Sequence, residues 1–225
     1  MIIAIDGPGA AGKSTIAKLL ARSLGYVYID TGAMYRAVAL AVLRRGIDIG
    51  DAGAVTAALA DIEIGLAHDA ETGEQRITLG GEDVTGLLRA PRISVGASDV
   101  SRIPAVRLRM AELQRKIAKS RDVVMDGRDI GTFVFPDADK KFYLTSSATE
   151  RARRRYLELR AGGVCATYEK CLADLTYRDE NDSARSFAPL AVARDAVYIE
   201  TDSSTTAREV AGFLRSEVDG YGEKG

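Results

Sequence analysis

Short apolar runs alternate with helix-like patterns along most of this chain. Five runs have the length of a core strand: Met1–Ile5, Tyr26–Ile29, Asp122–Asp126, Lys141–Thr145 and Ala196–Ile199. After the first run, apolar residues recur at helical spacing, as Ile16, Leu19, Leu20 and Leu24. Strands that alternate with helices in this way predict a parallel, doubly wound α/β sheet.

Further helices are predicted from the same periodicity and from capping residues. Their expected ranges are Ala33–Arg45, Asp51–Ala60, Ile93–Val100, Pro104–Lys119, Arg151–Arg160, Thr167–Asp182 and Thr205–Val218. Between about residues 61 and 89 the pattern changes to alternating polar and apolar residues, in Ile62–Leu66 and Arg76–Leu79. That alternation predicts a short antiparallel hairpin, inserted between the α/β units.

Composition narrows the classes of protein that the chain can belong to. The chain has 225 residues, 46% of them hydrophobic and 28% charged, with a net charge of −1. These values fit a soluble globular protein with no overall attraction to nucleic acid or to an anionic membrane. Cys165, Cys171 and the single His68 lack the spacing of a zinc site or a histidine triad. No secretory pattern or membrane-spanning stretch is visible, so we expect a cytoplasmic protein.

The stretch between the first strand and the first helix carries the sharpest motif. Its residues are Gly7, Pro8, Gly9, Ala10, Ala11, Gly12, Lys13, Ser14 and Thr15. Glycines let successive backbone N–H groups point at one phosphate, and the helix adds its own free N–H groups. Lys13 would reach the outer phosphates and the Ser14 hydroxyl would ligate Mg²⁺. The alternative is a glycine-rich turn without a ligand.

Polar residues also follow the next two strands along the sheet. Thr31, Tyr35 and Arg36 come after the second strand, and Asp126, Arg128 and Asp129 come after the third. Ligands of doubly wound sheets bind beyond the carboxyl ends of the strands, so these residues should converge with the glycine loop. Two local alternatives stay open: Thr31 as a plain helix cap with a solvated Arg36, and a turn with a local Asp–Arg pair at 128–129.

Two charged clusters lie further along the chain. The first, Arg178–Arg185, places charges on one helix face, and a solvated, salt-bridged face would explain it equally well. The second, Arg151–Arg155, holds four arginines in five residues. They would repel one another unless an anion lies among them. Nucleic acid, an acidic partner or a triphosphate could be that anion, and the position before Gly162–Gly163 favours a mobile lid over a nucleotide.

Together these motifs resemble those of the bacterial cytidylate kinases, a branch of the nucleoside monophosphate kinases. The resemblance covers nearly the whole chain. It rests on Ile5–Ser14, Asp30–Arg36, Asp126–Thr132, Val134–Asp137, Arg178–Asp179 and Ala188–Leu190. It implies a three-layer P-loop fold with a five-stranded parallel sheet, helices on both faces, an antiparallel insert and a helical lid. The implied core covers 1–35, 100–148 and 165–225, the acceptor-binding region 36–99 and the lid 149–164.

The resemblance also implies roles for single residues in phosphoryl transfer from ATP, with Mg²⁺, to CMP or dCMP. Ser98, Arg107 and Asp129 match base-recognition positions, while Arg36, Arg128 and Arg185 match positions near the monophosphate. Arg178 and Asp182 match sugar-binding positions, and Arg153 and Arg154 match the lid arginines expected on the ATP phosphates. Lys13, Arg128, Arg154 and Arg185 would stabilise the transferring group.

Other functions remain as alternatives at this point. A kinase of the same architecture could act on UMP, AMP or a metabolite alcohol. A nucleotide-dependent switch is less favoured, because Asn181 is the only asparagine and no guanine-binding Asn-Lys-x-Asp motif exists. A nucleic-acid-binding protein is less favoured, because the net charge is −1. We expect a monomer that binds small molecules and neither nucleic acid nor membrane.

Overall fold

The structure is a computed structural model that describes residues 1–69, 72–119 and 121–222. It divides into two compact units. The first combines residues 1–29 with the chain from residue 118 onward, and the second covers residues 30–117. Among the described residues, no helix is both long and apolar enough to cross a membrane.

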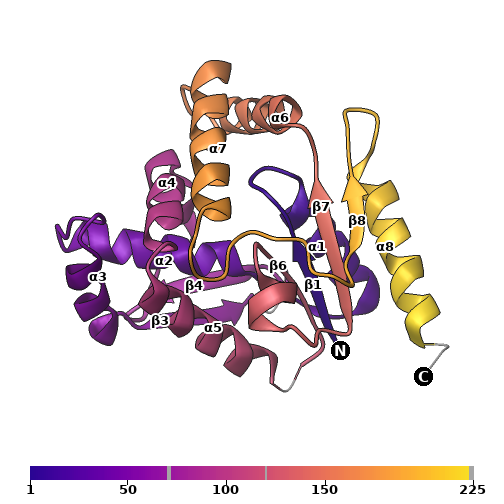
Figure 1. The fold of residues 1–225 in the computed structure, drawn as a ribbon, viewed down its shortest axis with the longest axis horizontal. Coiled ribbons are helices and arrows are strands. Elements are labelled where there is room, and N and C mark those ends of the chain that lie inside the picture. The colour runs from indigo at the N-terminus through magenta and orange to yellow at the C-terminus, as the bar shows by residue number, and fades with distance from the viewer. Residues whose placement is uncertain (70–71, 120, 223–225) are drawn as a thin grey trace. The chain divides into compact units, whose positions relative to one another are not determined.

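The first unit is built on a five-stranded parallel sheet, which confirms the predicted fold class (Figure 1). Its strands are β1 (Ile2–Asp6), β2 (Val27–Asp30), β6 (Val123–Gly127), β7 (Lys140–Thr145) and β8 (Val197–Glu200), in the order β2-β6-β1-β7-β8. β1 lies at the centre of the sheet, where the register places Asp6 opposite Gly127 on β6 and Tyr143 on β7. The carboxyl ends of the three central strands therefore meet at one edge.

Helices surround this sheet. They are α1 (Lys13–Leu24), α6 (Ala148–Ala161), α7 (Tyr168–Ser183) and α8 (Ala207–Gly222), which continues past the predicted end at residue 218. α1 and α8 pack on each other and on the sheet through a core that includes Leu20, Phe142 and Leu214. A single turn of π-helix, Ile130–Val134, follows β6.

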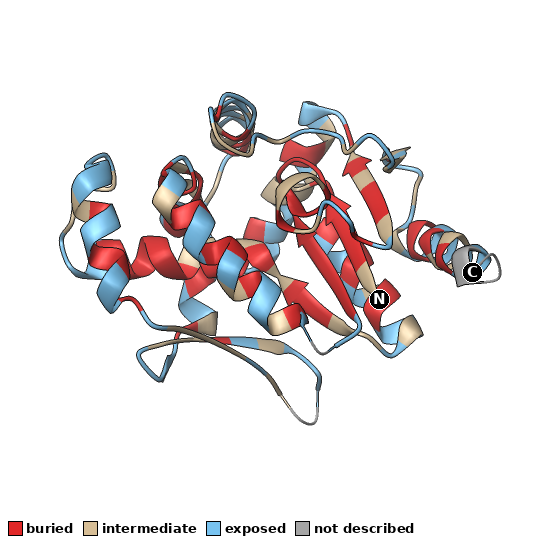
Figure 2. Ribbon diagram, turned by 60° about the horizontal axis from the view of Figure 1, so that its bottom comes forward, coloured by how far each residue is buried: buried red, intermediate tan, exposed pale blue. Residues whose placement is uncertain are grey.

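The second unit is mainly helical and carries the insert. Its helices are α2 (Thr31–Arg44), α3 (Ala52–Ala58), α4 (Pro91–Val100) and α5 (Pro104–Ala118), with 3-10 turns at Leu59–Asp61 and Thr85–Arg89. β3 (Ile64–His68), β4 (Gln75–Leu79) and the two-residue β5 (Glu82–Asp83) form a separate antiparallel sheet, as predicted. Its core gathers Met34, Val38, Ile77 and Ile93. Figure 2 shows the five-stranded sheet largely buried, whereas the insert strands are mixed in exposure.

Candidate active site

The glycine loop connects β1 to α1, the context that the sequence predicts. Gly7 has φ +146°, and a Cβ there would lie 1.9 Å from the carbonyl oxygen of Leu144, so no side chain fits. Gly12 is the N-cap of α1 with φ +88° and makes no side-chain cap hydrogen bond. The first N–H groups of α1 thus have no side-chain acceptor in the cap, an arrangement suited to an anion.

Lys13 lies within this loop instead of extending into solvent. Its side chain is buried, and Nζ donates to the carbonyl oxygen of Pro8 at 2.6 Å. Burial lowers the pKa of Lys13, and the nearby charge of Arg128 lowers it further, against the opposing carboxylates of Asp126 and Asp6. A buried lysine whose pKa is shifted by burial and by several nearby charges is a candidate functional residue.

Ser14 and Asp126 form an oxygen pair at the start of α1 and the end of β6. The exposed Ser14 donates through Oγ to Asp126 Oδ2 at 2.8 Å, and the Tyr28 hydroxyl donates to Asp126 Oδ1 at 2.7 Å. Mg²⁺ in phosphoryl-transfer sites takes oxygen ligands, usually one or two carboxylates together with waters and phosphate oxygens. These two residues therefore fit a magnesium ion that also binds nucleotide phosphates.

Asp6, the last residue of β1, is a functional candidate that the motif analysis missed. Its two carboxylate oxygens accept from the backbone N–H groups of Ile130 at 2.8 Å and Gly131 at 2.7 Å. Burial raises the pKa of Asp6 to about 7, although both hydrogen bonds lower it. Asp129, which immediately precedes these two donors, is also buried.

An arginine–aspartate cluster, centred on Asp182 of α7, lies beside the loop. Asp182 is buried and accepts from Arg128 Nε at 2.8 Å and from the guanidinium of Arg185. Burial alone would raise the pKa of Asp182, but the charges of Arg128, Arg185 and Arg178 outweigh it and lower that pKa. A Cβ on Gly9 would lie 3.7 Å from both Arg128 Nη2 and Arg178 Cζ, so two of these guanidinium groups adjoin the phosphate loop.

The four arginines at the start of α6 have different environments. Arg151 is buried, pairs with Asp179 at 2.7 Å and donates to the carbonyl oxygen of Gly9 at 3.1 Å. Arg155 pairs with Glu158 at 2.9 Å. The predicted repulsion is thus relieved by carboxylates of the protein itself. Arg151 was not among the predicted site residues, and no local pattern separates it from its neighbours.

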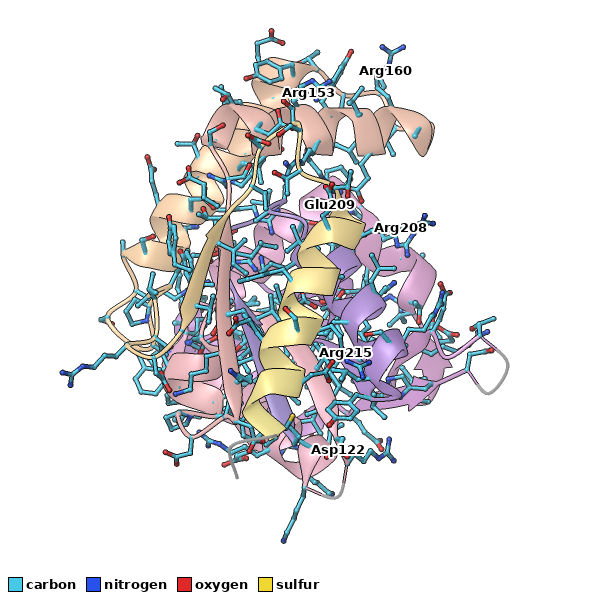
Figure 3. The ribbon with its side chains drawn as sticks, turned by 90° about the vertical axis from the view of Figure 1, so that its right-hand side faces the viewer. Asp122, Arg153, Arg160, Arg208, Glu209 and Arg215 are labelled. Atoms are coloured by element: carbon cyan, nitrogen blue, oxygen red, sulfur yellow. The ribbon has the colours of Figure 1, made fainter. Side chains whose placement is uncertain are left out.

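Arg153 and Arg154, the predicted lid arginines, share Glu150. Arg153 Nη1 lies 3.6 Å from Glu150 Oε1, and its side chain is 59% exposed, on the helix shown at the top of Figure 3. Arg154 donates to Glu150 at 3.2 Å, to Thr201 Oγ1 at 3.2 Å and to the carbonyl oxygen of Asp202 at 2.7 Å. Its Nη1 also lies 4.0 Å from where a Cβ on Gly12 would be, so Arg154 borders the phosphate loop.

In the second unit, the start of α2 differs from the alternative of a plain Thr31 cap with a solvated Arg36. The cap is Asp30, which accepts from the N–H of Ala33 at 2.9 Å, so α2 begins at the buried Thr31 and Thr31 is not the cap. Arg36 is not simply solvated, because it donates to Asp30 Oδ2 at 2.7 Å. Asp30 is the cap because its short side chain can accept from a free N–H group in the first turn of the helix, that of Ala33.

The other predicted residues of this unit lie on α2, α4 and α5. Arg107 is almost fully buried, its Nη1 donates to the carbonyl oxygen of Ser101 at 3.3 Å, and its guanidinium lies 5.7 Å from the Tyr35 ring centroid. Ser98 is buried, and its Oγ finds no hydrogen-bond partner among the residues that the structure describes. A buried hydroxyl without a partner is uncommon in proteins and is consistent with a ligand contact.

The fold and the glycine loop are those of a P-loop nucleotide-binding protein, and comparison with known proteins defines the family. The family model described as cytidylate kinase matches residues 3–217. A cytidylate kinase from Caldicellulosiruptor bescii is 51% identical over 89% of this chain and 88% of its own length. Another from Geobacter sulfurreducens is 50% identical over 97% of this chain and 92% of its own. The chain belongs to the cytidylate kinase family.

A solved structure agrees with this fold. An uncharacterised protein from Eubacterium ventriosum has a TM-score of 0.50 and 10% identity, over 97% of this chain and 98% of that one. At this identity the likeness concerns the fold alone.

Proposed function

We propose that this protein transfers the γ-phosphoryl group of ATP to CMP or dCMP, giving ADP and CDP or dCDP. The observation that carries the proposal is the charge arrangement in the first unit. Buried Lys13 lies in the phosphate loop, and Arg128 and Arg178 adjoin the same loop at Gly9. Such a group of cations suits the negative charge that develops on a phosphoryl group in transfer. The acceptor comes from the family, whose relatives are named cytidylate kinases.

Catalysis in this proposal needs no general base. The attacking oxygen belongs to the monophosphate of the acceptor, which is already ionised at neutral pH. The residues 7–15 hold the ATP phosphates, while Lys13, Arg128, Arg154 and Arg185 orient and neutralise the transferring group. Ser14 and Asp126 would hold Mg²⁺, which would supply charge neutralisation for the transferring group. Closure of the proposed lid, residues 149–164 with Arg153 and Arg154, would exclude water that could hydrolyse ATP.

The acceptor would be recognised through its base, sugar and phosphate. The Asp129 carboxylate would accept from the exocyclic amino group of cytosine, and Arg107 and Ser98 would donate to its ring acceptors. Uracil carries a carbonyl oxygen where cytosine carries that amino group, so its oxygen would face a carboxylate. We assign Thr31, Tyr35, Arg36, Arg128 and Arg185 to the phosphate side, and Arg178 and Asp182 to the sugar. The monomeric state, the cytoplasmic location and the domain limits stay predictions.

A panel of acceptors tests this proposal directly. ADP release would be followed with Mg²⁺–ATP and, in turn, CMP, dCMP, UMP, AMP and a metabolite alcohol. We expect CMP and dCMP to give the highest kcat/KM, and Asp129→Ala to reduce the preference for CMP over UMP by about ten- to a hundredfold. A faster reaction with AMP or an alcohol would favour a kinase of another acceptor. If the rate of ADP release is the same with and without each acceptor, a nucleotide switch is favoured.

A further inference from the structure

The end of β1 supports the loop that carries Asp129. Asp6 is far from Asp129 in the sequence, yet its carboxylate accepts hydrogen bonds from the two residues that directly follow Asp129. One oxygen accepts from Ile130 and the other from Gly131, so the carboxylate spans two successive N–H groups. Such a two-point contact fixes both the position and the rotation of that backbone segment.

The backbone around Asp129 is itself unusual. Residues Ile130–Val134 form one turn of π-helix, a rare conformation that is frequently found at functional sites. The carbonyl oxygen of Asp129 accepts from the N–H groups of Phe133 at 2.9 Å and Val134 at 3.1 Å. Asp129 is therefore held by the turn through its carbonyl group, and by Asp6 through the two residues after it.

Lys141 of β7 also packs against this backbone segment, at Gly131. A Cβ on Gly131 would lie 3.1 Å from Lys141 Cδ, 3.2 Å from its Cγ and 3.4 Å from Asp6 Oδ2. The Lys141 stem is fixed in turn, because its Nζ donates to both carboxylate oxygens of Asp195, at 2.9 and 2.8 Å, and to the carbonyl oxygen of Pro136. A Cβ on Gly131 would therefore crowd Lys141 and Asp6, and these side chains would have to move by a few tenths of an ångström.

We propose that Asp6 is a positioning residue for acceptor choice, which holds the Asp129 carboxylate in place through the backbone of Ile130 and Gly131. Asp6 does not touch the acceptor in this scheme. The inference rests on the proposed function, since it takes Asp129 as the group that distinguishes cytosine from uracil. The Asp129 carboxylate would accept a hydrogen bond from the base. That bond requires the carboxylate to stay within a few tenths of an ångström of its position.

Asp6→Asn is the direct test, because asparagine keeps the size but offers only one acceptor oxygen. Its amide nitrogen would face one of the two N–H groups, so one hydrogen bond is lost. Assays should run at about pH 8, since the pKa of Asp6 is about 7. We expect the ratio of kcat/KM for CMP to kcat/KM for UMP to fall by about three- to tenfold, with the KM for ATP unchanged. In an Asp129→Ala background the same change should have no further effect on the ratio.

Two further variants make the test decisive. Asp139→Asn is the matched control, because Asp139 also accepts from a backbone N–H of β1, that of Ile2 at 2.6 Å, but at the other end of the strand. It should leave the CMP to UMP ratio unchanged. If Asp6→Asn fails to fold, Gly131→Ala crowds Asp6 and Lys141 at the same backbone segment without removing a charge, and it should lower the ratio as well.

The outcomes separate this inference from the function on which it rests. If Asp129→Ala lowers the ratio but Asp6→Asn and Gly131→Ala slow both acceptors equally, Asp6 is only structural and the inference is wrong. If Asp6→Asn lowers the ratio further in the Asp129→Ala background, Asp6 acts by another route. If Asp129→Ala itself leaves the ratio unchanged, the base-reading role of Asp129 is wrong, and the inference falls with it.

Discussion

Two buried groups of opposite charge mark the end of β1 and the start of α1. Asp6 and Lys13 are each 4% exposed, and burial moves both pKa values toward neutrality. A protein selected for stability alone would place apolar residues at such positions, because desolvating an ion is unfavourable. Their presence here fits a functional site: nucleotide phosphates would balance the charge of Lys13, and the backbone N–H groups of Ile130 and Gly131 bind the Asp6 carboxylate.

Lys13→Ala should reduce turnover to below about a tenth of the wild-type rate while leaving the fold intact, because it removes a cation from the developing phosphoryl charge. The measurement is kcat in the ADP-release assay, with circular dichroism to follow the fold. Arg22→Ala is the control, since Arg22 is an exposed cation in the last turn of the same helix. A Lys13→Ala enzyme that keeps more than about a tenth of its activity would remove Lys13 from catalysis.

Asp6 should also give stability a distinct pH dependence. The pKa of its carboxyl is about 7 in the folded protein against an ordinary 3.8, so folding takes up a proton between these values. The stability that Asp6 contributes is therefore present at low pH and falls as pH rises from about 4 to about 7. Asp6→Asn lacks this titration, so its stability relative to wild type should rise across that range. Urea unfolding at several pH values measures it, and a constant difference between the two proteins would contradict the shift.

At the scale of elements, α6 and α7 together hold the phosphate loop. Arg151 on α6 pairs with Asp179 on α7 and donates to Gly9 of the loop, so one side chain joins three segments. Asp182, also on α7, pairs with Arg128 after β6. Some side chains of the charged runs thus fix the loop, and others are the ones proposed to bind ligands.

Arg151→Ala should destabilise the protein by about 2–4 kcal/mol and raise the KM for ATP. The change leaves the partly buried Asp179 without its partner and the Gly9 carbonyl without its donor. Arg155→Ala is the matched variant on the same helix. Its partner Glu158 is 67% exposed, so we expect a loss of about 0.5 kcal/mol or less. Denaturant unfolding compares the two, and equal losses would mean that the Arg151 contacts add nothing specific.

At the scale of the whole molecule, each unit has its own hydrophobic core. One gathers residues of β1, α1, β7 and α8, including Ile3, Leu20 and Phe142. The other gathers residues of α2, β4 and α4, including Val38 and Ile77. The residues proposed for ATP belong to the first unit, whereas those proposed for the acceptor come from both units: Asp129 and Arg128 from the first, and Ser98, Arg107 and Arg36 from the second.

The proposal uses Lys13 for ATP and not for binding the acceptor, so the responses to the two nucleotides should be separable. A saturating ligand stabilises the state that binds it, by about 2.7 kcal/mol at 100 times its Kd. ATP and CMP should each raise the melting temperature of the wild-type protein. Lys13→Ala should weaken the ATP shift and leave the CMP shift intact. Thermal melts with each nucleotide alone measure this, and loss of both shifts would show that Lys13 supports the fold and not one ligand.

The sequence by itself determined the strand–loop–helix at residues 2–24, the parallel sheet and the antiparallel insert. These features depend on local periodicity and on glycine at positions that tolerate no side chain. Each of them can therefore be recognised in one continuous stretch of the sequence. It also determined the family, because the motifs that carry it are short and contiguous.

Only the tertiary structure decided which charged residues act as supports. Asp6 contacts residues 124 and 125 positions away in the chain, and Arg151 contacts one 142 positions away. The cap of α2 was likewise missed, since Asp30 and Thr31 are both good capping residues and only the backbone geometry selects Asp30. A contact between distant segments depends on how strands order in the sheet, and that order, β2-β6-β1-β7-β8, has no local signature in the sequence.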